Sequence, residues 1–191
     1  MATAIREQLT GSNTALVATN VAWLQQALSL LGRMDDATFA APPKQLAHHR
    51  VGSHLRHVLE FYECFLEGVG SSCIDYDARK RDALVETDRH AAADKICSII
   101  RRIEESPLLQ HDSLLFVRME NADAEKSQDQ YLRSSICREL QVLSSHTIHH
   151  FALIAVTLRI HGLEVDPDFG MSPSTLRYVA AQTLAASPEA A

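Results

Sequence analysis

The chain has few cysteines, and they are not arranged as a paired motif. Its four cysteines are far apart, with no Cys-x-x-Cys: Cys64, Cys73, Cys97 and Cys137. This spacing argues against a zinc ribbon, and in a chain without an export signal it favours reduced core cysteines over disulfides. Two of them, Cys64 and Cys137, share predicted helices with histidines, so a thiolate ligand is a minor alternative at this stage.

Long apolar runs are also missing. No stretch approaches the ~20 apolar residues that span a bilayer, and residues 1–7 lack the continuous apolar segment of an export signal. We therefore expect a cytoplasmic protein with no membrane partner. At 191 residues, the chain can bury a stable core without disulfides or structural metals, and no linker divides it. The sequence predicts one domain over residues 1–184 and a disordered tail over residues 185–191.

Basic runs and phosphate-binding motifs are absent as well. Lys and Arg number 18 against 24 Asp and Glu, which gives a net charge of -6. This balance argues against nucleic acid as a partner. The sequence has no glycine-rich phosphate loop, dinucleotide fingerprint or serine nucleophile elbow, so the enzyme classes that depend on these motifs are disfavoured.

Helical periodicity dominates what is present. Four long segments repeat apolar residues at spacings of three and four, over about residues 13–33, 51–68, 88–106 and 135–161. Ser12 or Asn13 is the expected cap of the first, and the second starts between residues 45 and 51. Helices of this length bury their apolar stripes against one another. The predicted fold class is therefore all-α, a four-helix bundle.

Three shorter features accompany the helices. Residues 113–119 look extended and can pair with residues 130–133, which predicts a small β-hairpin between the third and fourth helices. Ser172 and Pro173 are typical of the start of a short C-terminal helix. A segment of mixed charge, residues 74–82, follows the second helix. Such a run is usually a salt-bridged surface turn, but its arginines would suit an anionic substrate if it reached the end of the bundle.

The fourth helical segment carries His146, His149 and His150 inside an apolar run. Imidazole is costly to bury unless its nitrogens find partners, so the cluster indicates a polar site built into a core. His146 and His150 are four residues apart and share one helix face, where they can chelate a metal ion. The a/d spacing predicts that this face, which also carries Glu139, points into the bundle. The pair His146 and His149 stays open as an alternative.

The second helical segment supplies His54 and His57, and spacing does not decide which of them points inward. Two histidines from one helix and one from another leave a coordination position for water, which is the open geometry of a catalytic zinc site. Glu139 and Glu60 are the candidate catalytic residues, able to orient an imidazole or move a proton. The other histidines are interpreted as solvated: His48, His49, His90, His111 and His161.

A structural role for these histidines competes with the metal site. A single histidine on an apolar helix face usually bonds to a carbonyl or carboxylate, and Glu139 or Glu60 could be that partner. Clusters on two helices at helical spacing favour a metal. Three imidazoles are compatible with zinc, nickel or iron, of which zinc is favoured.

The histidine pattern resembles that of the DinB-like superfamily of metal-binding four-helix bundles. Its hallmark is a histidine on the second helix and a His-x-x-x-His pair on the last long helix. The run His-Thr-Ile-His-His at residues 146–150 supplies the pair, His146 and His150. The run His-Leu-Arg-His at residues 54–57 supplies the histidine of the second helix, which is best matched by His57. The resemblance covers roughly residues 12–162. It implies a divalent ion on these three histidines, and homodimerisation through exposed helix faces.

The superfamily includes metal-dependent hydrolases and transferases or isomerases that use a low-molecular-weight thiol. The resemblance therefore implies a metal-dependent enzyme with a small-molecule substrate, in which the ion activates water or a thiol. The alternative is a non-catalytic bundle that binds metal or a protein partner and uses its histidines as structural groups.

Overall fold

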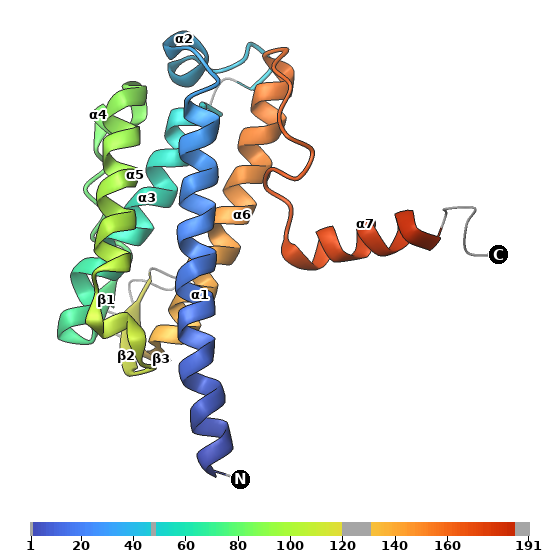
Figure 1. Cartoon of the computed structure of the whole chain (residues 1–191). Coiled ribbons are helices and arrows are strands. Elements are labelled where there is room, and N and C mark those ends of the chain that lie inside the picture. The colour runs from blue at the N-terminus through green and yellow to red at the C-terminus, as the bar shows by residue number, and fades with distance from the viewer. Residues whose placement is uncertain (1, 47–48, 120–130, 186–191) are drawn as a thin grey trace.

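The computed structural model describes residues 2–46, 49–119 and 131–185, and the side chains from Asn13 to Thr183 within them. Its four long helices are α1 (Ala2–Leu31), α3 (Val51–Gly68), α5 (Arg89–Glu104) and α6 (Ile136–Ile160). They run side by side (Figure 1), and α1 contacts α5 and α6, which both contact α3. The predicted bundle of four long helices is confirmed. Among the described helices, none combines the length and apolar character needed to cross a membrane.

Shorter helices connect and extend the bundle. Helix α7 (Pro173–Ala185), predicted from its Ser-Pro start, points away from the bundle (Figure 1). The predicted disordered tail lies outside the described residues, apart from Ala185 at the end of α7. Four one-turn elements were not predicted: α2 (Asp36–Ala40), α4 (Ala83–Thr87) and the 3₁₀ turns η1 (Val69–Ser71) and η2 (Pro107–Gln110).

The predicted bounds hold at three of the four long helices and are wrong at the first. Asp88 caps α5 and Ser135 caps α6 through their side-chain oxygens, as their positions before apolar runs predict. Asn13, by contrast, lies buried inside α1, where its Nδ2 donates to the carbonyl oxygen of Leu109 at 3.4 Å. The predicted cap is wrong because this amide bonds to η2 instead of to the end of its own helix.

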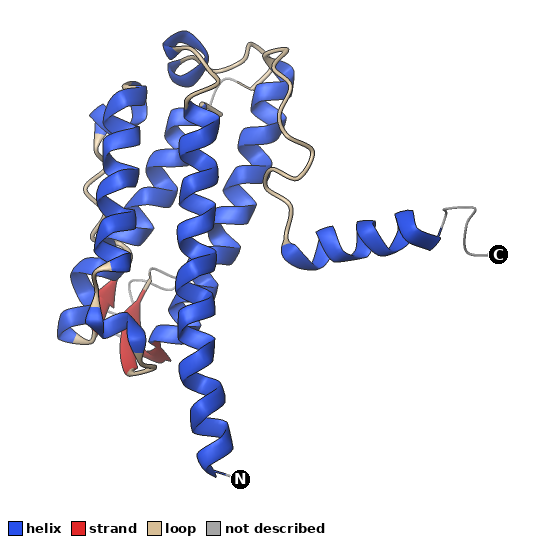
Figure 2. Cartoon of the chain, viewed as in Figure 1, coloured by secondary structure: helices blue, strands red, loops and turns tan. Residues whose placement is uncertain are grey.

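A three-stranded sheet at one end of the bundle corrects the all-α prediction (Figure 2). Strands β2 (Leu114–Arg118) and β3 (Leu132–Ser135) are antiparallel, which confirms the predicted hairpin; most of its turn lies outside the described residues. Strand β1 (Cys73–Asp75) was not predicted, and it pairs in parallel with β2. A three-residue strand has no detectable alternation of its own, so only its distant partner reveals it.

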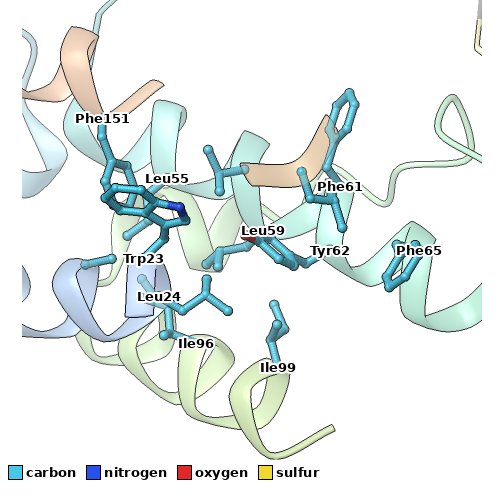
Figure 3. Close-up of a cluster of buried hydrophobic side chains, with 14 of the residues drawn as sticks. Trp23, Leu24, Leu55, Leu59, Phe61, Tyr62, Phe65, Ile96, Ile99 and Phe151 are labelled. Carbon is cyan, nitrogen blue, oxygen red and sulfur yellow. The ribbon is translucent and has the colours of Figure 1, made fainter. Parts of the chain in front are cut away.

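Large apolar side chains from all four long helices fill the core (Figure 3). A buried polar network crosses it. The Tyr62 hydroxyl donates to Asn20 Oδ1 at 2.7 Å and lies 3.2 Å from Thr147 Oγ1. Asn20 Nδ2 donates in turn to the Leu140 carbonyl at 3.0 Å. Because these groups come from α1, α3 and α6, the network sets how α3 and α6 lie against each other.

The start of α3 lies so close to α4 that only glycine fits. A Cβ atom at Gly52 would lie 2.0 Å from the carbonyl oxygen of Glu86 and 3.0 Å from Phe39. The Glu86 side chain also pairs with Arg56 on α3 at 2.9 Å. This contact holds α4, and the segment leading to it, against the helix that carries His57.

Candidate metal centre

Three histidines meet where α3 and α6 pack together. One ligand atom from each of His57, His146 and His150 lies within 4.8 Å of the others. The Nε2 atoms of His57 and His146 are 3.2 Å apart. Two nitrogens bound to one tetrahedral zinc at ~2.1 Å are separated by about 3.4 Å, so this pair is spaced for a shared ion. The three histidines singled out in the sequence therefore form a cluster that can hold a metal.

The face of α6 that carries His146 and His150 is only partly buried. The buried line of α6 runs through Leu140, Leu143 and Thr147, whereas His146 and His150 are half-buried beside it. The prediction that this face points into the bundle holds for the buried Glu139 and in part for the two histidines, because α6 is apolar on several faces and its periodicity does not define a single inward stripe. The two histidines lie at the margin of the core.

The surroundings keep the three rings neutral. Burial, together with the guanidinium groups of Arg79 and Arg56, lowers the pKa of His57 to about 4. Burial and neighbouring imidazoles lower the pKa of His146 to about 4 and that of His150 to about 3. A neutral imidazole offers the lone pair that a metal requires. Within the described residues, the buried Nδ1 of His146 has no hydrogen-bond partner, so protein groups alone do not satisfy this ring.

His54, the alternative to His57, lies behind the cluster. Its Nδ1 is 3.1 Å from Nδ1 of His150, and its Nε2 is 3.1 Å from Nδ1 of His49. A contact to the outer nitrogen of a ligating histidine fixes the orientation of the ring. The geometry thus puts His57 in the cluster and His54 in a supporting position. His49, interpreted as solvated, is half-buried against His54, and His48 lies outside the described residues.

Aromatic rings and a surface hollow border the cluster. Phe61 stacks on His146 with ring centroids 4.2 Å apart, and Tyr76 stacks on Phe61 at 5.0 Å. A shallow hollow of about 550 Å³ adjoins His146, and its other lining residues are Arg138, Gln141, Val142, Ser145 and His149. The cluster therefore has stacked aromatic rings on one side and an open hollow next to His146.

The two predicted catalytic glutamates are buried and bonded to other groups. Glu139 accepts from the Tyr76 hydroxyl at 2.8 Å and from the Ser134 hydroxyl. Glu60 pairs with Arg56 at 2.9 Å and accepts from the backbone N–H of Asp82 at 3.0 Å. Among the described contacts, neither carboxylate bonds to a histidine. Both fasten the segments around the cluster, and their catalytic role stays a prediction.

Arg79 is the residue that sequence reasoning did not single out. Its Nη1 lies 2.7 Å from Nδ1 of His57, and its guanidinium carbon is 5.5 Å from the centroid of Phe61. The available signal was the charged segment 74–82, which does form a surface ion pair, Lys80 with Glu67 at 2.6 Å. The same segment also reaches the histidines, which only the folded chain reveals.

The cysteines play no part in this cluster. None of the four forms a disulfide; Cys64 is buried as predicted, whereas Cys73 and Cys97 are exposed, contrary to the core position expected for them. Burial raises the pKa of the Cys64 thiol to about 11. Among the described residues, Cys64 is not part of the group that converges with His57, so the minor alternative of a Cys64 thiolate ligand is disfavoured.

Folding stability of the metal-free protein should fall as the pH drops from 6.5 to about 4. The cluster histidines have folded-state pKa values near 4 or below against an ordinary value of 6.5, so the unfolded chain binds more protons in this window. Their contribution is complete above pH 6.5 and is lost towards pH 4. Urea unfolding of chelator-treated protein at several pH values would measure it. His146→Gln should flatten this dependence and exposed His90→Gln should not; equal slopes would contradict the assignment.

Comparison with known proteins leaves the family open. No family model matches the chain, and no solved structure does. A curated protein that matches is FK506-binding protein 5 from Rhizopus delemar, 38% identical over 109 residues. The match covers 57% of this chain but only 28% of that protein. The similarity therefore concerns a part of a much longer protein.

Proposed function

We propose that this protein is a metal-dependent enzyme of the DinB-like type in which His57, His146 and His150 hold one divalent ion. The observation that carries the proposal is the convergence of one ligand atom from each ring within 4.8 Å. The resemblance of the histidine pattern to the DinB-like superfamily supports it, as does the position of the histidines on α3 and α6. Zinc is favoured for three imidazoles, with nickel and iron as alternatives.

A divalent ion on three imidazoles acts as a Lewis acid and lowers the pKa of water or a thiol at an open position. The protein's own groups prepare the site. Burial keeps the ligand rings neutral, His54 orients His150, and Phe61, itself stacked on Tyr76, covers one side of the His146 ring. Glu139 and Glu60 serve here as anchors of the surrounding segments. The hollow beside His146 is the proposed place for a small-molecule substrate.

Cobalt substitution tests both the ion and its open position. Metal-free protein is loaded with Co²⁺, counted by elemental mass spectrometry, and its visible spectrum is recorded before and after addition of 2-mercaptoethanol. We expect about one cobalt per chain and, for thiol chemistry, a new thiolate-to-cobalt charge-transfer band. A bound ion without that band favours water activation and hydrolysis. Failure of the wild-type chain to bind cobalt or zinc would contradict the proposal.

A non-catalytic bundle is the second candidate, and one observation favours it. The rings can bond to one another without an ion, since His57 lies 3.2 Å from His146 and His54 lies 3.1 Å from His150. In that case the histidines act as a structural polar network. This candidate predicts that neither added zinc nor a chelator changes the melting temperature, whereas a bound ion raises it.

A further inference from the structure

Arg79 reaches the three-histidine cluster from the segment between β1 and α4. Its Nη1 is 2.7 Å from Nδ1 of His57, and its guanidinium lies over the ring of Phe61. Through these two contacts the side chain lies against one ligand of the cluster and against the aromatic ring that stacks on another, His146. Arg79 is thus the cationic side chain in hydrogen-bond contact with the proposed metal site.

The segment that carries Arg79 is anchored before and after it. On one side, Tyr76 is buried and its hydroxyl donates to Glu139 at 2.8 Å. On the other, the backbone N–H of Asp82 donates to Glu60 at 3.0 Å, and the Asp82 side chain caps α4. The backbone at residue 79 is therefore held beside the cluster.

The charge of Arg79 has no partner of opposite sign among the described residues. Its Nε is buried without a hydrogen-bond acceptor, and its close contact is a neutral imidazole. Arg79 lines a small hollow together with three glutamates, and each glutamate pairs with another cation: Glu60 with Arg56, Glu63 with Lys95 and Glu67 with Lys80. Arg79 therefore retains a free donor and an uncompensated charge, which suits an anion.

The contact of Arg79 with His57 and the binding of a metal exclude each other. Guanidinium has no acceptor, so Nδ1 of His57 must accept, and a neutral ring then carries its hydrogen on Nε2. Nε2 is the atom that faces His146. A metal on Nε2 needs that lone pair, which moves the hydrogen to Nδ1, opposite the Arg79 donor. Two donors cannot bond, so the arginine must leave His57 when the ion binds.

We propose, on the basis of the proposed metal site, that Arg79 is the specificity residue that binds a carboxylate of the substrate. An ion on Nε2 of His57 would displace the Arg79 guanidinium from Nδ1 of that ring, and the fork would then be available to the anion. One guanidinium with a free Nε matches a single carboxylate, which accepts two parallel N–H bonds. The substrate class is therefore a small molecule that carries a carboxylate near its reacting group.

Calorimetric zinc titration with and without propionate tests this role. The metal-free full chain is compared as wild type, Arg79→Ala, Arg79→Lys and Arg81→Ala; the last removes the same charge from an exposed side chain two residues away. Arg79→Ala should bind zinc about threefold more tightly than wild type without propionate, because the competitor for His57 is gone. Propionate should tighten zinc binding about fivefold in wild type and Arg81→Ala, and not in Arg79→Ala.

Arg79→Lys, which keeps the charge without the fork, should show a smaller propionate effect. If Arg79→Ala does not fold, Arg79→Gln carries the same expectations. Arg79 variants that behave as Arg81→Ala does in both titrations would overturn the inference and leave the metal site intact. A wild-type chain that binds neither zinc nor cobalt would overturn the proposed function, and the inference with it.

Discussion

His146→Ala should weaken zinc binding by more than about 100-fold, since even changes that only support a ligand cost 10–100-fold. His146 contributes a nitrogen 3.2 Å from that of His57, and its loss leaves two imidazoles for the ion. The variant purified without chelator should hold far less than one ion per chain. Elemental mass spectrometry and calorimetric titration would measure content and affinity.

His149→Ala is the matched control for this experiment. His149 lies on the same helix, next to His150, but it is exposed and outside the cluster. Its removal should leave metal content unchanged, which separates the three-histidine site from adventitious binding by surface imidazoles. If both variants kept the ion, His146 would not be a ligand. If both variants lost the ion, the alternative pair of His146 with His149 would be favoured.

Glu139→Ala should lower the melting temperature by about 4–8 °C, which corresponds to about 2 kcal/mol in a chain of this size. The buried Tyr76 hydroxyl and the Ser134 hydroxyl both lose their acceptor. Because Glu139 forms no described bond with a histidine, zinc content should stay at the wild-type level. Calorimetric melting and elemental analysis of one preparation would measure both quantities.

Tyr76→Phe provides the comparison for Glu139. Tyr76→Phe removes the hydroxyl and leaves the Glu139 carboxylate bonded to Ser134. If both single variants lose stability through the Tyr76–Glu139 bond, the double variant Tyr76→Phe/Glu139→Ala should have nearly the same melting temperature as Glu139→Ala. An activity lost in Glu139→Ala at an unchanged melting temperature and zinc content would contradict the anchoring role. That result would favour the catalytic role predicted from sequence.

Local patterns predicted the ends of three of the four long helices and the shared face of His146 and His150. Asp88 and Ser135 precede apolar runs and cap α5 and α6 through bonds within a few residues of themselves. The four-residue spacing of His146 and His150 likewise places them on one helix face whatever packs against it. These features could be predicted because a few neighbouring residues determine them.

Contacts between distant segments were beyond that reasoning. Asn13 was expected to cap a helix and instead bonds to Leu109, and β1 exists only through its pairing with β2. The half-buried setting of His49 likewise depends on a contact with His54 across the start of α3. In each case, a partner supplied by the fold outweighs the local preference of the residue.

The sequence by itself determined the long helices, the hairpin and which histidines were candidates, because periodicity and spacing are properties of neighbouring residues. Only the tertiary structure decided that His57 joins His146 and His150, that His54 supports them, and that Arg79 faces the cluster. These choices depend on how α3 rotates against α6 and where segment 74–82 is anchored. Several faces of α6 are apolar, so its sequence alone does not define which face is buried. The packing of α6 against α1 and α3 determines that face, together with the hydrogen bonds among Asn20, Tyr62 and Thr147.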